Sequence, residues 1–252
     1  MIRESLTRAL RARRIRFSPN HDSPITNHAV VAAGFFLLLL SLAARPAAGG
    51  EAEWKLLYDR YELQFQRGNL EQAELIAREA LREAESTLGE DHRATELSLA
   101  RAALILRLNG KPEEALPLAQ RAVRLATRRY GPEGAGTAVA LQGEAEVLFA
   151  LKRFAEAEQL HRRSLAVFQA RYGPKSFQAA TSLHNVGTML LAQEDFPDAE
   201  KFLRRALAVK EEVLGPGHRS VAHTINNLVL ALEGQGKSGE AEKYRRRAAA
   251  YR

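Results

Sequence analysis

Histidine is the residue type in this chain of 252 residues that could most readily bind a metal or transfer a proton. His218 and His223 stand five residues apart and share a helix face poorly, whereas helical zinc-binding pairs stand four apart. His161 and His184 have no pattern of Asp or Glu around them. The chain has no cysteine, which excludes disulfides and thiolate metal sites. We therefore predict no metal site and no cofactor.

One acid beside a hydroxyl, Glu85-Ser86, is similar to the catalytic Glu-Ser of lytic transglycosylases, some of which carry helical solenoids. This pair, however, occupies a position of a sequence repeat that elsewhere holds Thr127-Arg128, Gln169-Ala170 and Glu211-Glu212. No residues remain for a sugar-cleaving domain, and no Gly-rich phosphate loop follows a strand pattern. We therefore predict no catalytic residue and no enzyme activity.

The repeat is marked by a glycine signal that returns every 42 residues, at Leu88-Gly89, Tyr130-Gly131, Tyr172-Gly173 and Leu214-Gly215. A proline follows the last three of these glycines. Glycine beyond a helix C-terminus can take the left-handed conformation, and proline then blocks continuation of the helix. A fixed period of this size predicts an array of helical repeats, which usually binds other proteins.

Small and aliphatic residues recur in the same columns of every repeat. Alanine occupies one column without a break, at Ala73, Ala115, Ala157, Ala199 and Ala241. A second column is small, at Ala80, Ala122, Ser164, Ala206 and Ala248, and a third is aliphatic, at Leu57, Leu99, Leu141, Leu183 and Ile225. Within each repeat the apolar positions follow helical spacing in two segments separated by a turn such as Gly68-Asn69 or Glu194-Asp195. Each repeat is therefore predicted to be a pair of helices.

Residues 199–215, with the His218 that follows, resemble the long tetratricopeptide repeat of kinesin light chains. The run Ile225-Asn226-Asn227-Leu228 is similar to the segment that opens the first helix of such repeats. Arg101-Ala102 and Gly143-Glu144 depart from that pattern. The resemblance covers residues 51–252 and implies an all-α, right-handed superhelical solenoid of about five helix pairs, with repeats at about 51–91, 92–133, 134–175, 176–217 and 218–252.

The resemblance further implies that stacked first helices line a concave groove that binds a partner protein or peptide. Asparagine can both donate to and accept from a peptide backbone, so it can bind a partner without strict sequence choice. By repeat register, the groove-facing residues are predicted to be Tyr58, Asp59, Arg101, Gln142, Glu146, His184, Asn185, Thr188, Asn226 and Asn227. The alternative interpretation is that these are ordinary solvated surface residues.

The net charge of +7 is concentrated at the N-terminus. Residues 1–50 hold seven of the 37 Lys and Arg but only two of the 30 Asp and Glu, so the array itself is nearly balanced. Nucleic-acid binding would require at least a basic stripe. The candidate cluster is Lys243, Arg245, Arg246, Arg247 and Arg252, and a terminal helix needs such a polar outer face in any case. We predict neither a nucleic-acid partner nor a small-molecule substrate.

The first 50 residues differ in chemistry from the array. Residues 1–28 are basic and offer no apolar core, so they are predicted to be a disordered tail or not to be translated. Ala29 to Ala44 is an uncharged apolar run, and small residues follow it up to residue 50. This order is typical of a secretory signal, whereas a membrane anchor, the alternative, prefers about 20 apolar residues. Both interpretations place residues 51–252 on the outer side of the cytoplasmic membrane, anchored or free.

These observations predict an exported or membrane-tethered scaffold for protein–protein interaction. Two other classes remain open. A structural tether would self-associate in a membrane complex, and it predicts a retained anchor. An exported enzyme with an unrecognised site predicts a deep pocket that holds a carboxylate or histidine with a strongly perturbed pKa.

Overall fold

The computed structural model describes residues 48–249, so the predicted tail at residues 1–28 and the apolar segment from Ala29 to Ala44 lie outside the described residues. The described part is helical and contains no strand. None of its helices combines the length and the apolar character that a membrane span requires. The signal and anchor interpretations therefore stay predictions.

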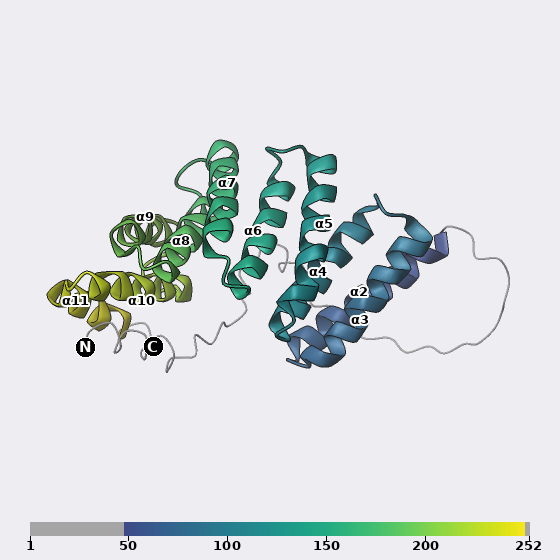
Figure 1. Cartoon of the computed structure of the whole chain (residues 1–252), viewed down its shortest axis with the longest axis horizontal. Coiled ribbons are helices and arrows are strands. Elements are labelled where there is room, and N and C mark those ends of the chain that lie inside the picture. Colours follow the sequence, from purple (N-terminus) through teal and green to yellow (C-terminus); the bar gives the residue numbers. More distant parts are fainter. Residues whose placement is uncertain (1–47, 250–252) are drawn as a thin grey trace. The chain divides into compact units, whose positions relative to one another are not determined.

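Five pairs of helices follow one another along the chain (Figure 1). The first helix of each pair is α2 (Ala48–Gln66), α4 (Arg93–Leu108), α6 (Ala135–Ala150), α8 (Phe177–Ala192) or α10 (Arg219–Gly234). The second helix is α3 (Leu70–Glu83) with the π-helical turn η1 (Ala84–Leu88), α5 (Pro112–Tyr130), α7 (Phe154–Tyr172), α9 (Phe196–Leu214) or α11 (Ser238–Ala249). The prediction of an all-helical solenoid of helix pairs is confirmed.

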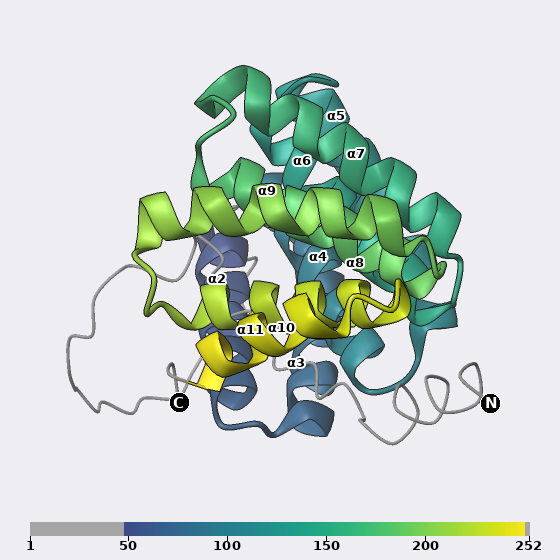
Figure 2. The ribbon, with the colours of Figure 1, turned by 90° about the vertical axis from the view of Figure 1, so that its left-hand side faces the viewer.

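Each helix packs against the next helix in the sequence, both within pairs and between them. Figure 2 shows the last pair, α10 and α11, nearest the viewer, together with α9, which packs on α10. Because every pair buries its apolar face against its neighbours, the core runs through the stack of repeats.

The alanine column predicted from the sequence lies at the closest helix contacts. Ala73, Ala115, Ala157, Ala199 and Ala241 are all fully buried. Leucine or isoleucine of the aliphatic column is also buried in all five repeats. Small side chains let the two helices approach, and the aliphatic side chains fill the space beside them. Because alanine and aliphatic side chains fill the helix contacts in every repeat, the core needs few aromatic residues.

The turn inside each repeat requires one residue with a positive φ. Glycine supplies it in three repeats, at Gly68, Gly110 and Gly236, with φ between 74° and 75°. Lys152 and Glu194 take the same place in the other two repeats, each with a φ of 62°. A side chain with a Cβ atom is strained in this region, so these two turns are less favourable than their glycine counterparts.

A carboxylate that is largely removed from solvent connects successive repeats at the start of the second helices. Glu200 of α9 accepts hydrogen bonds from Arg204 at 2.7 Å, Gln235 at 2.7 Å and Lys237 at 2.7 Å. Glu74 of α3 repeats this arrangement with Arg78, Asn109 and Lys111. We name each set of four residues a carboxylate clamp. The two clamps fix the turn of one repeat to the second helix of the repeat before it.

The clamps depend on ionised carboxylates. Burial by itself raises the pKa of Glu200, but the hydrogen bonds from Lys237, Arg204 and Gln235 outweigh it and lower the pKa to about 2. The pKa of Glu74 is likewise about 2, since hydrogen bonds from Lys111, Asn109 and Arg78 outweigh its burial. A carboxylate that accepts several hydrogen bonds from charged donors is expected to behave in this way.

Candidate partner-binding surface

The first helices of neighbouring repeats are joined by side-chain hydrogen bonds at every boundary. Arg101 of α4 reaches Tyr58 of α2, and Arg107 of α4 reaches Glu146 of α6. At the remaining two boundaries, Gln142 of α6 donates a hydrogen bond to Ser182 of α8, and Asn227 of α10 donates one to Thr188 of α8. The five first helices thus present one continuous face, which we name the first-helix face.

At the N-terminal end of this face, the predicted residues form a cluster around Arg101. Its Nε donates to the Tyr58 hydroxyl at 3.1 Å and lies 3.0 Å from a carboxylate oxygen of Glu62. The guanidinium also lies over the Tyr58 ring, 5.7 Å from its centroid. Asp59 is exposed and pairs with Lys55 at 2.7 Å on the same helix. Tyr58 and Arg101 therefore hold two repeats together, and Asp59 remains at the surface.

In the centre, Gln142 and Glu146 also bond between repeats. The Gln142 side chain donates to the Ser182 hydroxyl at 2.9 Å. Arg107 donates to Glu146 at 2.8 Å, and only 10% of the Arg107 side chain is exposed. Both predicted residues are half-buried and already have partners inside the array.

At the C-terminal end, α8 and α10 are joined twice. The His184 ring lies 3.2 Å from the Thr224 hydroxyl, and Asn227 donates to the Thr188 hydroxyl at 2.9 Å. Thr188 in turn donates to the His184 backbone oxygen. Three of the predicted groove residues on α8 and α10, namely His184, Thr188 and Asn227, thus have internal partners.

Two predicted asparagines have no such partner. Within residues 48–249, neither Asn185 nor Asn226 makes a side-chain hydrogen bond. Asn226 is exposed and Asn185 is half-buried. Of the ten predicted groove residues, these two keep their full hydrogen-bonding capacity for a partner.

Sequence reasoning missed an open apolar region in the centre of the first-helix face. Val139 of α6 is 46% exposed, and one helical turn further along Gly143 has space for a side chain, with no atom within 4 Å of where its Cβ would be. Gly143 shares its column with Asn185, and Ala100 of α4, which shares its column with Gln142, is exposed. The break of the asparagine pattern at Gly143 was the available signal.

The histidines with perturbed pKa values lie within the packed array. His161 of α7 is 1% exposed, and its burial lowers its pKa to about 4. The pKa of His184 is lowered well below its usual value by burial, and Lys210, His223 and His161 contribute in the same direction. Because His161 cannot reach a dissolved substrate, its perturbed pKa is the consequence of packing.

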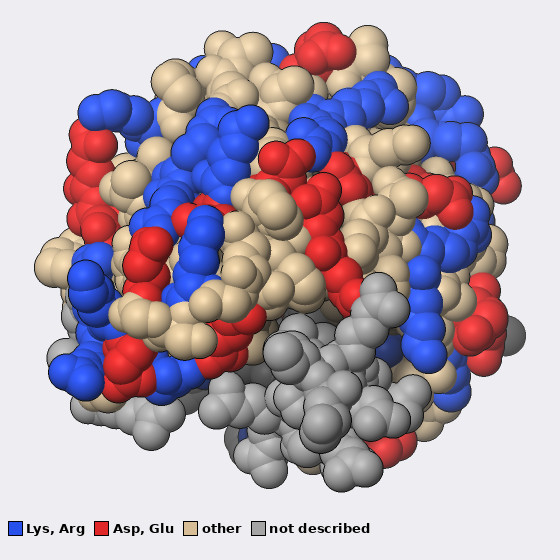
Figure 3. Space-filling view, turned by 60° about the vertical axis from the view of Figure 1, so that its left-hand side comes forward, with Lys and Arg blue, Asp and Glu red and all other residues tan. Residues whose placement is uncertain are grey.

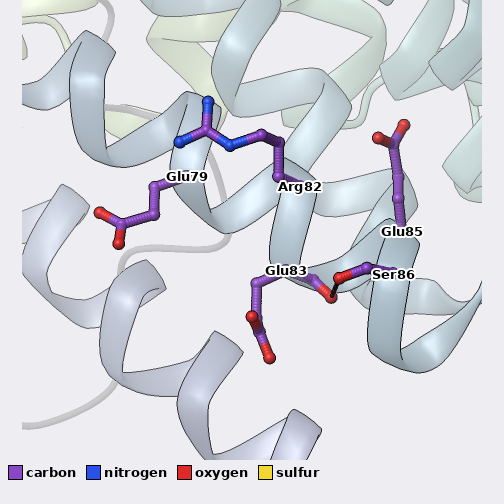
Figure 4. Close-up of a pocket in the computed structure, with 5 residues that line it drawn as sticks. All are labelled: Glu79, Arg82, Glu83, Glu85 and Ser86. Atoms are coloured by element: carbon purple, nitrogen blue, oxygen red, sulfur yellow. Dashed lines mark hydrogen bonds between the residues drawn. The ribbon is translucent and has the colours of Figure 1, made fainter.

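The Glu85-Ser86 pair lines a shallow depression at the end of α3, together with Glu79, Arg82 and Glu83 (Figure 4). Figure 4 shows the Glu85 side chain directed away from the Ser86 hydroxyl. Glu85 pairs with Arg121 of α5, and Ser86 donates to the Glu83 backbone oxygen at 3.3 Å. Both groups therefore contact the neighbouring structure and not each other.

Within residues 48–249, no group of three or more His, Asp or Glu side chains is placed to hold a metal ion. The face seen in Figure 3 carries Lys and Arg interspersed with Asp and Glu. Arg204 of α9 illustrates this pattern, since it pairs with both Glu200 and Glu240. On this face the basic side chains do not form an uninterrupted stripe.

Solved structures share this fold at low sequence identity. The nearly identical TPR-like repeats assigned to a kinesin light chain of Podosopora anserina superpose with a TM-score of 0.68 at 18% identity, covering 83% of this chain and 97% of that one. BtubC (BKLC) from P. vanneervenii gives 0.67 at 20% identity, covering 81% and 89%. A Rap protein in complex with competence and sporulation factor gives 0.66 at 19% identity, covering 80% of this chain and 54% of that one. At sequence identities of 18–20%, these similarities show a shared fold and nothing more.

A comparison with curated proteins finds no match. The family model for the tetratricopeptide repeat, in contrast, matches four overlapping segments, residues 62–128, 95–170, 143–212 and 178–252. Together these segments span most of the chain and fall within the array of helix pairs. The chain therefore belongs to the tetratricopeptide repeat family.

Proposed function

We propose that this protein is a non-enzymatic scaffold that binds a segment of a partner protein along its first-helix face. The observation that carries this proposal is the combination, on that face, of unbonded amide groups at Asn185 and Asn226 and exposed apolar surface at Val139 and Gly143. Asn185 and Asn226 offer donors and acceptors to a peptide backbone. Apolar surface beside them adds burial when a partner binds.

The fold is compatible with this role. A Rap protein of the same fold has been solved in complex with competence and sporulation factor. Tetratricopeptide solenoids present extended concave surfaces, which suit an elongated ligand better than a small molecule. The internal hydrogen bonds of Tyr58, Arg101 and Gln142 keep the first helices in fixed positions, so the surface is organised before a partner arrives.

We further propose that the array works outside the cytoplasm. The support is the sequence from Ala29 to Ala44, whose apolar run follows a basic segment and precedes small residues. Cleavage after this run would release the array, and retention would tether it to the membrane.

The binding proposal is tested by filling the open space at Gly143. Partners are first captured from membrane and soluble fractions and identified, and affinity is then measured for the Gly143→Trp variant. Because a Cβ at this position meets no neighbour and glycine is unfavourable inside a helix, the variant should fold at least as stably as the parent. We expect the affinity for a captured partner to fall about tenfold or more, since the indole occupies the binding surface.

The matched control is Ala170→Trp, which adds the same side chain to an exposed position on the second helix α7. It should bind like the parent. Unchanged affinity in Gly143→Trp together with a loss in Ala170→Trp would move the binding surface to the second helices and refute the proposal.

A further inference from the structure

The first helix of the array exposes two leucines in columns that the later repeats bury, apart from Ala140, which is half-buried. Leu56 and Leu63 of α2 are 54% and 45% exposed. The column of Leu63 continues with Ile105, Val147, Met189 and Ala231, none of which is more than 4% exposed. In the column of Leu56, Ser98, Ser182 and Thr224 are at most 1% exposed. The exposure of α2 is therefore a property of its place in the array.

These columns are buried elsewhere because each later first helix packs against both helices of the preceding repeat, as α6 does against α4 and α5. In the column of Leu56, Ser182 accepts a hydrogen bond from Gln142, and Thr224 lies 3.2 Å from the ring of His184, both on the preceding first helix. A charged residue in the neighbouring column shows the contact directly. Glu144 of α6 is half-buried, hydrogen-bonds with Gln120 of α5 and is attracted by Arg124 of α5. Within residues 48–249, α2 has no helix before it to provide this cover.

The residue of α2 in the column of Glu144 is Arg60. Arg60 is exposed and makes no ion pair with any residue between 48 and 249. The face formed by Leu56, Arg60 and Leu63, which we name the open end face, thus combines an apolar stripe with an unpaired cation. A covering helix would complement it with apolar side chains and a carboxylate opposite Arg60.

The opposite end of the array is closed by polar residues. Arg245 of α11 stands in the column where α9 has the buried Leu203, and Arg245 is half exposed and pairs with Glu242 and Glu233. Terminal repeats of solenoids normally carry such polar outer faces. Within residues 48–249, the open end face therefore differs in character from the C-terminal end of the array.

We propose that the open end face is a docking site for an amphipathic helix of a partner protein, which continues the repeat-to-repeat interface by one helix. This helix has the chemistry of the second helices of the array, with alanine and leucine toward α2, polar residues outward, and an Asp or Glu opposite Arg60. The site borders the first-helix face, because Leu56 shares its column with Ser182 and Thr224, but Leu56, Arg60 and Leu63 are not among the predicted groove residues.

Neither the chain's own apolar run nor a second copy stacked head to tail matches this face. Ala29 to Ala44 contains no charged residue, so it offers neither a carboxylate for Arg60 nor a polar outer side. A second copy stacked head to tail would bring the charged Arg245 and Glu242 to Leu56 and Leu63.

The test uses stapled helical peptides with the sequence of residues 112–130, so that helix formation does not limit binding. In the array this sequence is α5, whose Arg124 faces the column of Arg60. One peptide keeps Arg124 and the other carries Arg124→Glu. Each is labelled and titrated with the full-length chain while fluorescence anisotropy is recorded. We expect the Arg124→Glu peptide to bind about fivefold more tightly, and Arg60→Glu in the protein to reverse this preference.

The apolar contribution is tested with Leu56→Glu and Leu63→Glu, each of which should weaken binding about tenfold or more. Leu75→Glu is the matched control, because Leu75 of α3 is 62% exposed but lies away from the open end face, and it should leave binding unchanged. Absence of binding, or binding that Leu56→Glu does not weaken, overturns the proposal.

Two further measurements would show whether a different occupant covers the open end face. Binding that appears only after residues 1–47 are deleted would assign the face to the chain's own N-terminal segment. A dimer of the parent protein that Leu63→Glu converts to a monomer in sedimentation experiments would assign it to a second copy. Either result would replace the partner helix as the occupant.

Discussion

Asn185 and Asn227 occupy the same column of the repeat, yet only Asn227 is hydrogen-bonded within residues 48–249. The difference arises from the neighbouring first helix. Asn227 finds the Thr188 hydroxyl as its acceptor, whereas the equivalent acceptor for Asn185 is Glu146, which already binds Arg107. The sequence alone predicted the type and the repeat position of both asparagines. Which acceptor on the neighbouring helix is already occupied depends on side-chain geometry, and the sequence does not show it.

The two asparagines should therefore respond differently to replacement by alanine. Asn227→Ala removes the bond to Thr188 and should lower the free energy of unfolding by about 1 kcal/mol. Asn185→Ala should leave stability unchanged but weaken partner binding by about 1 to 3 kcal/mol, roughly 5- to 150-fold. Thermal melts and binding titrations of both variants decide this. Equal melts for the two variants would contradict the structural role of Asn227.

A second prediction concerns the carboxylate clamp at Glu200, whose folded-state pKa of about 2 lies below its ordinary 4.5. A lowered carboxylate pKa stabilises the fold above pH 4.5, and this contribution is lost as the pH falls from about 5 to 2. The amount is up to about 3 kcal/mol for this residue. Glu200→Gln should thus be less stable than the parent at pH 7, and the difference should disappear near pH 2.

The measurement is urea unfolding of both proteins across this pH range. The buried His161, with a pKa of about 4, also destabilises the fold as the pH falls below about 6.5, since protonation is favoured in the unfolded chain. This effect is common to both proteins and cancels in their difference. A stability difference that does not change with pH would refute the ionised clamp.

At the scale of helices, the period of 42 residues predicted more than any single residue did. It predicted helix pairs and an alanine column at their contacts, and Ala157 and Ala199 are indeed fully buried. The clamps were not predicted, although Glu74, Glu158 and Glu200 stand in one column, because Leu116 interrupts that column in the second repeat. The turn residues Lys152 and Glu194 show the same limit, since neither suggests a positive φ by its type.

These turns provide a third prediction. Replacing Glu194 or Lys152 by glycine removes a strained left-handed residue and should stabilise the protein by about 0.5 to 1 kcal/mol each. The reverse change, Gly110→Lys, should destabilise it by a similar amount. Melting temperatures of the three variants provide the measurement, and destabilisation by Glu194→Gly would show that the side chain makes a contact that outweighs the strain.

At the scale of the whole chain, a nearly balanced array follows an N-terminal region in which basic residues outnumber acidic ones seven to two. The described helices contain no segment suited to cross a membrane, and the segment predicted to export or tether the array is Ala29 to Ala44. Solenoid stability is approximately a sum of repeat and interface contributions, so residues 48–252 should fold without that segment. Export and folding are therefore separable by deletion.

The last prediction uses this separation. A reporter that is active only in the periplasm is fused after Arg252, and activity is compared for the full chain, for a chain lacking residues 1–50, and for Leu38→Arg. A charge in the middle of the apolar run opposes both signal function and membrane insertion, so we expect Leu38→Arg to reduce activity and the deletion to abolish it. Equal amounts of fusion protein in a whole-cell immunoblot serve as the control. Activity that survives the deletion would show that the array needs no such segment to reach the reporter's compartment, and sequencing the N-terminus of the active fusion distinguishes a cleaved signal from a retained anchor.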